Sequence, residues 1–195
     1  DWTFAPMVDI CRDPRWGRGQ ETWGEDPYFT GEMASEYVKG MQGDHPKYLK
    51  TAACAKHYAV HSGPEKDRHT FNAIVTKREL HDTYLPAFKK LVVDAKVESV
   101  MGAYNRVFGE PACASEFLLD QILRDEWGFE GHVVSDCGAL ADIHKYHNIT
   151  KDAAESAALA LQHGCDLGCE QDCFVFTEIP EAINRGLISE AEVDR

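Results

Sequence analysis

The sequence contains no uninterrupted apolar run close to the ~20 residues that a membrane-spanning helix requires, so no membrane span is expected. It is also poor in basic residues: 20 lysines and arginines stand against 33 aspartates and glutamates, a formal net charge of −13. A negatively charged surface repels phosphate backbones, which argues against a nucleic-acid partner. The seven cysteines are an odd number, so they do not imply a complete disulfide framework.

Three of the cysteines recur at every fourth position, as Cys165, Cys169 and Cys173. On a helix they would share one face and could hold a metal ion, but two glycines within this segment argue against a helix. A disulfide inside 165–173 is the second interpretation. Buried free thiols are the third and preferred one, because unpaired cysteine behaves as a small apolar residue.

Short apolar segments alternate with helix-like segments along the chain, an order that predicts a parallel sheet covered by helices. Strands are expected at 3–10, 51–57, 97–104, 132–135 and 164–167. Helices are expected at 26–40, 78–95, 117–127, 151–163 and 174–185, with a last one opening at Ser189. A closed (β/α)8 barrel typically needs about 250 residues. The expected fold class is therefore α/β, a TIM-type barrel of which this chain covers about five central strand–helix units.

Charged residues stand at the C-terminal ends of two of these strands. The strand at 132–135 is followed by Asp136, and the strand at 51–57 ends in Lys56 and His57. Barrel enzymes keep their chemistry at this end of the strands, so the three side chains are expected to share a site. Structural explanations compete: an aspartate after a strand often caps a helix, and a histidine there can be a satisfied core residue. The lysine favours a site, because burying it is costly unless an anion meets it.

The segment 12–27 mixes arginines, acidic residues, two tryptophans and glycines. One interpretation is a rigid loop held by its own arginine–carboxylate pairs. The other is a polar clamp for a hydroxyl-rich ligand, because arginine forks and carboxylates suit neighbouring hydroxyls and aromatic faces suit the apolar side of a sugar ring.

The segments 12–27, 55–58, 100–104 and 133–137 together resemble glycoside hydrolase family 3, in matching order and over nearly the whole chain. The resemblance implies a retaining, exo-acting β-glycosidase that removes terminal non-reducing sugars from oligosaccharides or aryl glycosides. It further implies that residues 1–195 are part of an N-terminal catalytic barrel domain, and that a second α/β sandwich domain lies outside this chain. No metal or organic cofactor is implied, and a periplasmic or extracellular location is favoured by the resemblance alone.

The resemblance also assigns roles to single residues. Asp136 is similar to the nucleophile that forms a covalent glycosyl-enzyme, and Tyr104 to a strand-end tyrosine close to it. Lys56, His57 and Arg18 resemble the residues that bind sugar hydroxyls. A retaining enzyme needs a second carboxyl group roughly 5–5.5 Å from the first. In most of the family it comes from the second domain, so no residue of this chain is assigned as the acid/base.

One alternative within the chain concerns His69. Family members that cleave N-acetylglucosaminides use an Asp/His dyad on the loop after the Lys-His strand, and Asp67 and His69 stand at that spacing. However, Ala59-Val60 replaces the Pro-Gly of that loop, so we expect His69 to shape the sugar pocket.

The residue after the nucleophile bears on the choice of sugar. It is Cys137 here, whereas many β-glucosidases of the family carry tryptophan, and 135–139 and 165–169 resemble the β-xylosidase and α-L-arabinofuranosidase branch. β-Xylosidase is therefore the first prediction. Trp23 and Phe108 depart from that branch and keep β-glucosidase as an alternative, and a non-catalytic sugar-binding barrel is a third. A disulfide between Cys113 and Cys137 near the site is a further possibility that we consider.

Overall fold

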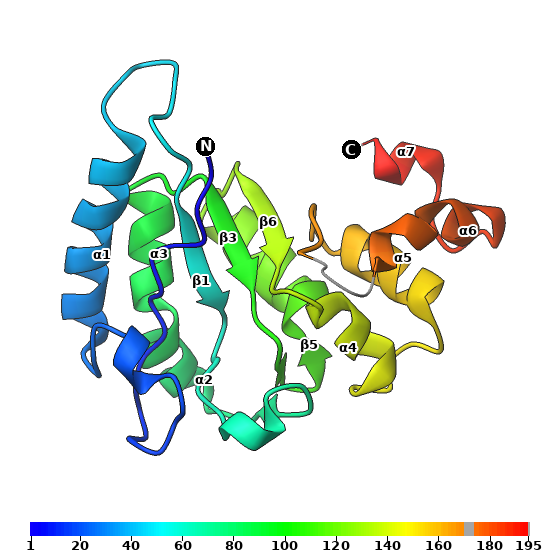
Figure 1. Cartoon of the computed structure of the whole chain (residues 1–195), viewed down its shortest axis with the longest axis horizontal. Helices are drawn as coiled ribbons and strands as arrows, with labels where there is room; N and C mark the ends of the chain where they lie inside the picture. Colours follow the sequence, from blue (N-terminus) through cyan, green and yellow to red (C-terminus); the bar gives the residue numbers. More distant parts are fainter. Residues whose placement is uncertain (170–173, 195) are drawn as a thin grey trace.

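The computed structural model describes residues 1–169 and 174–194. Its centre is a three-stranded parallel sheet of β1 (Cys54–Tyr58), β3 (Ser99–Gly102) and β6 (His132–Ser135), in the order β1-β3-β6. The three arrows run in one direction, so their C-terminal ends meet at one edge of the sheet (Figure 1). Nearly all residues of these strands are buried, as expected for a parallel sheet that is covered on both faces.

The segment predicted as a strand at 3–10 lies beside β1 but is not a continuous strand. It makes a parallel bridge between Met7 and Lys56, and Val8 donates its N–H to the Lys56 carbonyl at 2.7 Å. Pro6 has no N–H to donate, so the ladder is interrupted at that point. The predicted strand at 164–167 is likewise reduced to one parallel bridge, between Leu167 and Val134.

Helix α1 (Pro27–Gln42) begins where its sequence predicts. Asp26 caps it by accepting N–H groups of the first turn at 2.8 and 3.1 Å, and proline at the first position needs no donor there. The helix packs against α3 (Pro86–Val93) on one side of the sheet (Figure 1). Gly31 permits their close approach, since an added Cβ would lie 3.2 Å from the Lys90 side chain.

The predicted helix at 78–95 is divided into three parts: α2 (Lys77–Glu79), a π-helical stretch (Leu80–Tyr84) and α3. Pro86 at the start of α3 cannot donate to the preceding turn, which accounts for the division. The segment 117–127, predicted as a helix, is confirmed as helical and has π-helical geometry. The other helical elements of the described residues are η1 (Gly19–Glu21), η2 (Glu65–Asp67), η4 (Ala112–Ala114), η5 (the π-helical Glu116–Glu126), α4 (Ala139–Lys145), α5 (Ala153–Gln162), η6 (Val175–Glu178), α6 (Ile179–Asn184) and α7 (Glu190–Val193).

A small second sheet follows the C-terminal ends of β1 and β3. It contains β2 (Asn72–Ala73), β4 (Arg106–Val107) and β5 (Glu110–Pro111) in the order β2-β4-β5. None of these three short strands was predicted from the sequence. In the described ranges, no helix is long and apolar enough to cross a membrane.

Candidate active site

Five of the six predicted site residues line one open cavity of about 520 Å³ at the C-terminal ends of β1, β3 and β6. His69 is the sixth and lies outside its lining. The cavity is lined by Gly17, Arg18, Glu21, Lys56, His57, Glu65, Arg68, Tyr104, Asp136 and Cys137. Residues from five separate stretches of the chain therefore meet here, as expected for strands that end at the same edge.

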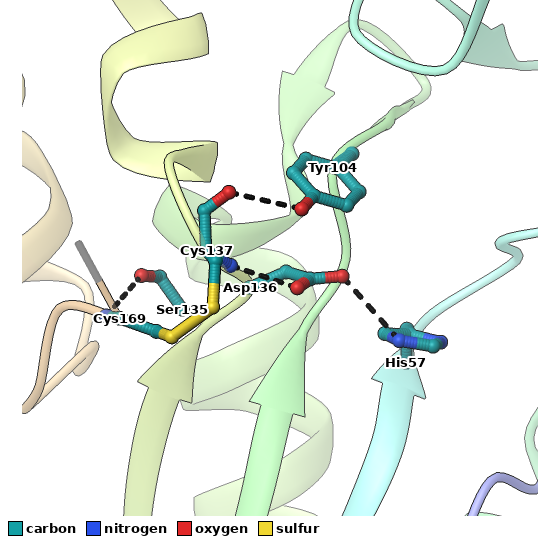
Figure 2. The surroundings of a disulfide bond; sticks show 6 residues. All are labelled: His57, Tyr104, Ser135, Asp136, Cys137 and Cys169. Carbon is teal, nitrogen blue, oxygen red and sulfur yellow. Dashed lines mark hydrogen bonds and ion pairs between the residues drawn. A yellow bond between two sulfur atoms is a disulfide. The ribbon is translucent and has the colours of Figure 1, made fainter. Parts of the chain in front are cut away.

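Asp136 follows β6 directly, and its N–H is held by the Gly102 carbonyl at 2.9 Å. The residue is 8% exposed. Its Oδ1 accepts the N–H of Cys137 at 2.7 Å, and its Oδ2 lies 3.4 Å from His57 Nε2 (Figure 2). Helix α4 has Gly138 at its N-cap and no side-chain cap. The carboxylate is thus not used to cap that helix and faces the cavity instead.

Tyr104 is held beside Asp136 by the backbone of Cys137. Its Oη donates to the Cys137 carbonyl at 2.9 Å (Figure 2). Burial, and then the charge of Asp136, raise the pKa of the Tyr104 phenol. The group therefore remains a neutral hydroxyl near the carboxylate.

Arg18 pairs within its own loop, as the first interpretation of the segment 12–27 expects, and it also reaches the cavity. Its Nε and Nη2 each donate to Glu21 at 2.9 Å, while its Nη1 lies 3.3 Å from His57 Nε2. Internal pairing holds the loop, and the guanidinium still reaches the cavity. Among the described residues, neither tryptophan of the segment lines this cavity: Trp16 is buried against His61, with ring centroids 5.7 Å apart.

His69 has a buried partner that its sequence neighbourhood does not reveal. Its Nδ1 lies 2.7 Å from Asp142 Oδ2, on α4, 73 residues away. Burial raises the pKa of Asp142 to about 6, and the hydrogen bond from His69 opposes that rise. The imidazole is half-exposed and packs edge-on against Tyr104 at 4.9 Å. In the described part of the chain His69 pairs with Asp142, and no contact with Asp67 is found.

Asp9 is a residue of the site region that the sequence analysis missed. It is buried, and its Oδ2 lies 3.0 Å from the backbone N and 2.8 Å from Nδ1 of His57. It is the single charged residue in the apolar segment 3–10. The rule that drew attention to Asp136, a charge near the end of an apolar strand, could have found it.

A disulfide joins Cys137 to Cys169 and stands beside the nucleophile candidate (Figure 2). The considered Cys113–Cys137 bond is therefore wrong: Cys113 is buried with its Sγ 3.4 Å from the Ala103 carbonyl. Cys169 is brought to Cys137 because its own N–H donates to Ser135 Oγ at 3.1 Å, next to the strand end.

The disulfide also bears on the three spaced cysteines. Cys169 is bonded outside 165–173, Cys165 is buried, and Cys173 lies outside the described residues. No group of three or more histidine, cysteine, aspartate or glutamate residues suited to a metal ion is found in the part of the chain that the structure describes.

The chain is similar to known proteins over its whole length. The family model described as the glycosyl hydrolase family 3 N terminal domain matches residues 1–195. A "Xylan 1,4-beta-xylosidase" of Xylanibacter ruminicola is 54% identical over 196 residues, which are 100% of this chain and 22% of that protein. A "Beta-xylosidase/alpha-L-arabinofuranosidase 2" of Medicago sativa subsp. varia is 44% identical, over 98% of this chain and 25% of that protein.

Solved structures agree with these similarities. A GH3 exo-beta-xylosidase (XlnD) in complex with a xylobiose aziridine activity-based probe has a TM-score of 0.94 and 34% identity, over 99% of this chain and 26% of that one. A beta-glucosidase from Erythrobacter marinus has a TM-score of 0.91 and 35% identity, over 98% of this chain and 26% of that one. The chain spans about a quarter of the length of the curated relatives that it matches.

Proposed function

Because the chain belongs to glycoside hydrolase family 3, we propose that it supplies the nucleophile and the sugar-binding part of a retaining, exo-acting β-xylosidase. Family membership and the similar structures confirm the predicted resemblance and the α/β-barrel fold class. The observation that carries the proposal is Asp136, a carboxylate at the end of a parallel strand. It lies in an open cavity together with Arg18, Lys56 and His57.

The geometry suits a nucleophilic carboxylate. The N–H of Cys137 holds Oδ1 at 2.7 Å, so the Asp136 side chain has a defined orientation while Oδ2 faces His57 and the cavity. Attack by Asp136 on the anomeric carbon forms an ester bond to the sugar and breaks the glycosidic bond. Water then hydrolyses the ester and regenerates the carboxylate, so that the sugar retains its configuration.

The leaving oxygen needs a proton donor, and the carboxyl groups in the cavity lining besides Asp136 are poor candidates. Glu21 is paired with Arg18, and Glu65 is paired with Arg68. The hydrogen bond from Arg18 lowers the pKa of Glu21, so this carboxyl group does not readily carry a proton. These pairs support an acid/base from outside residues 1–195, in a second domain of the longer protein.

Xylose is the proposed sugar because of the relatives and the residue that follows the nucleophile. The curated relatives reported above carry xylosidase in their names. Cys137 lines the cavity and is bonded to Cys169, whereas many β-glucosidases of the family carry a tryptophan at the position of Cys137. β-Glucosidase remains the second candidate, because a beta-glucosidase structure superposes with a TM-score of 0.91.

The test uses the full-length protein and its Asp136→Asn variant. Both are assayed on aryl β-xyloside, β-glucoside, α-L-arabinofuranoside and β-N-acetylglucosaminide. We expect the wild type to prefer the xyloside and Asp136→Asn to lose activity on the order of 10³-fold or more, because the group that forms the covalent bond is gone. Asp120→Asn is a matched control, because Asp120 lies in a different cavity.

Two results would contradict the proposal. Activity of Asp136→Asn within about tenfold of the wild type would remove the nucleophile assignment. Preference for the N-acetylglucosaminide would favour His69 as the acid/base, with Asp142 rather than Asp67 as its partner. A 2-fluoro-xyloside, whose covalent intermediate hydrolyses slowly, offers a direct check. After incubation and proteolysis, mass spectrometry should find the sugar bound to the peptide that contains Asp136.

A further inference from the structure

His57 is enclosed by polar partners on both sides of its ring. On one side, Asp9 Oδ2 accepts the backbone N–H of His57 at 3.0 Å and lies 2.8 Å from Nδ1. On the other side, Nε2 lies 3.3 Å from Arg18 Nη1 and 3.4 Å from Asp136 Oδ2. Both Asp9 and His57 are buried, so the contacts between them are made away from solvent, whereas the Nε2 contacts with Arg18 and Asp136 lie at the open cavity.

The Arg18 contact indicates which ring nitrogen carries the proton. A guanidinium N–H can only donate, so Nε2 is the acceptor in its contact with Arg18. The Asp136 carboxylate at 3.4 Å can only accept and would favour a hydrogen on Nε2, but the shorter contact of 2.8 Å between Nδ1 and Asp9 Oδ2 favours a hydrogen on Nδ1. A neutral imidazole with an unprotonated Nε2 carries its hydrogen on Nδ1, where Asp9 Oδ2 stands ready to accept it. Burial lowers the pKa of His57 to about 3, which agrees with a neutral ring.

We propose that Asp9 is a positioning residue that holds His57 in the Nδ1–H tautomer, so that Nε2 is presented as an acceptor beside Asp136 and holds Arg18 in the cavity. The role rests on the proposed function, because His57 and Arg18 are the residues that bind the sugar hydroxyls. One oxygen of Asp9 fixes both the backbone and the ring of His57. The ring therefore cannot turn its donor side to the cavity while Asp9 is ionised.

The arrangement has a consequence for pH dependence. Burial raises the pKa of Asp9 to about 7, and nearby positive groups oppose the rise. Below that pH the carboxyl group takes up a proton; Oδ2–H donates to Nδ1, and the ring hydrogen is then carried on Nε2. Nε2–H and Arg18 Nη1–H are then both donors, so the hydrogen bond between them is lost, and Nε2–H faces the Asp136 carboxylate 3.4 Å away. The charged and titratable groups that act on this pair are Arg18, Glu21, Lys56, His61 and Asp136.

Two substitutions of Asp9 in the full-length protein separate positioning from simple packing. Asp9→Asn keeps an oxygen that accepts both hydrogens of His57 but cannot titrate. Asp9→Leu has a similar size and accepts neither. We expect Asp9→Leu to lose about 10- to 100-fold in kcat/KM at pH 8, as partners of functional histidines usually do. Asp9→Asn should recover most of that loss.

The pH profile is the decisive readout, because a purely structural role would not move it. In the wild type, kcat/KM on the preferred glycoside should fall as the pH drops through about 7. In Asp9→Asn that acid limb should move to lower pH. An acid limb that stays in place, or equal losses in both variants with unchanged thermal unfolding, would overturn the proposal. Asp120→Asn, which removes the carboxylate of a separate His–Asp contact with His163, should leave the profile unchanged.

The tautomer can also be observed without any turnover. In protein labelled with 15N-histidine, and with the His57 signal assigned through His57→Gln, Nδ1 should be protonated and Nε2 unprotonated at pH 8. A protonated Nε2 would refute the proposal even if both Asp9 variants failed to fold. If the wild type hydrolyses no glycoside, the proposed function fails, while the tautomer measurement still decides the role of Asp9.

Discussion

Reduction of the Cys137–Cys169 disulfide should both destabilise the protein and slow its chemistry. Cys137 connects several parts of the site: its N–H holds Asp136 at 2.7 Å, and its carbonyl accepts the Tyr104 hydroxyl at 2.9 Å (Figure 2). Its sulfur is tied to Cys169, whose carbonyl accepts the N–H of Gly138 at 2.8 Å. Without the bond, the backbone that orients the nucleophile candidate keeps only its hydrogen bonds.

The size of the stability loss follows from the loop that the disulfide closes. The two cysteines are 32 residues apart in sequence. In the chain-entropy relation, that separation corresponds to about 3.7 kcal/mol at 25 °C. For a cooperative unit of about 150–250 residues, that is a decrease of about 7–15 °C in Tm, and a larger cooperative unit in the full-length protein shifts less.

The assay compares the wild type with Cys169→Ser, each with and without dithiothreitol, in the full-length protein. We expect the reductant to lower the Tm and the kcat/KM of the wild type to the values of the variant, and to leave the variant unchanged. Cys113→Ser is the matched control, because Cys113 is a buried free thiol that the disulfide does not involve. It should respond to the reductant as the wild type does.

The reasoning would be refuted by a wild type that loses less than about 1 kcal/mol on complete reduction, since the loop-closure relation predicts several times more. Complete reduction must be shown by counting free thiols in the unfolded protein. A large stability loss with an unchanged kcat/KM would mean that hydrogen bonds alone are sufficient to orient Asp136.

The remaining predictions concern single side chains of the site and the core. Tyr104→Phe removes the bond to the Cys137 carbonyl and should lower kcat/KM about tenfold, with an unchanged far-UV spectrum. Tyr58→Phe leaves the buried Leu118 carbonyl without its donor, and should lower the free energy of unfolding by about 1 kcal/mol in guanidinium titrations without changing KM. His69→Gln should raise KM for the xyloside more than it lowers kcat; a kcat loss on the order of 10³-fold would instead identify an acid/base.

Local sequence signals predicted the elements that local interactions control. The strand at 132–135 and the start of α1 at Pro27 were confirmed, because a β-branched run and an Asp-Pro cap act on their own neighbourhood. The predicted strands at 3–10 and 164–167 were wrong as continuous strands. Their apolar character reflects burial beside the sheet, and burial alone does not create a hydrogen-bonded ladder.

Contacts over long sequence separations could not be predicted in the same way. His69 meets Asp142 over 73 residues and His57 meets Asp9 over 48, and the partner considered for Cys137 was not the cysteine to which it is bonded. Each pairing depends on which elements lie side by side in the sheet. No local sequence pattern around these residues indicates which elements lie side by side.

The sequence by itself determined the family, the alternation of strands and helices, and the charged residues at the strand ends, because residue type and short-range spacing carry those properties. Only the tertiary structure decided the partners of those residues: Asp9 behind His57, Asp142 behind His69 and Cys169 beside Asp136. The physical reason is that a partner is chosen by distance in space. The parallel order β1-β3-β6 sets that distance by bringing remote segments to one edge of the sheet.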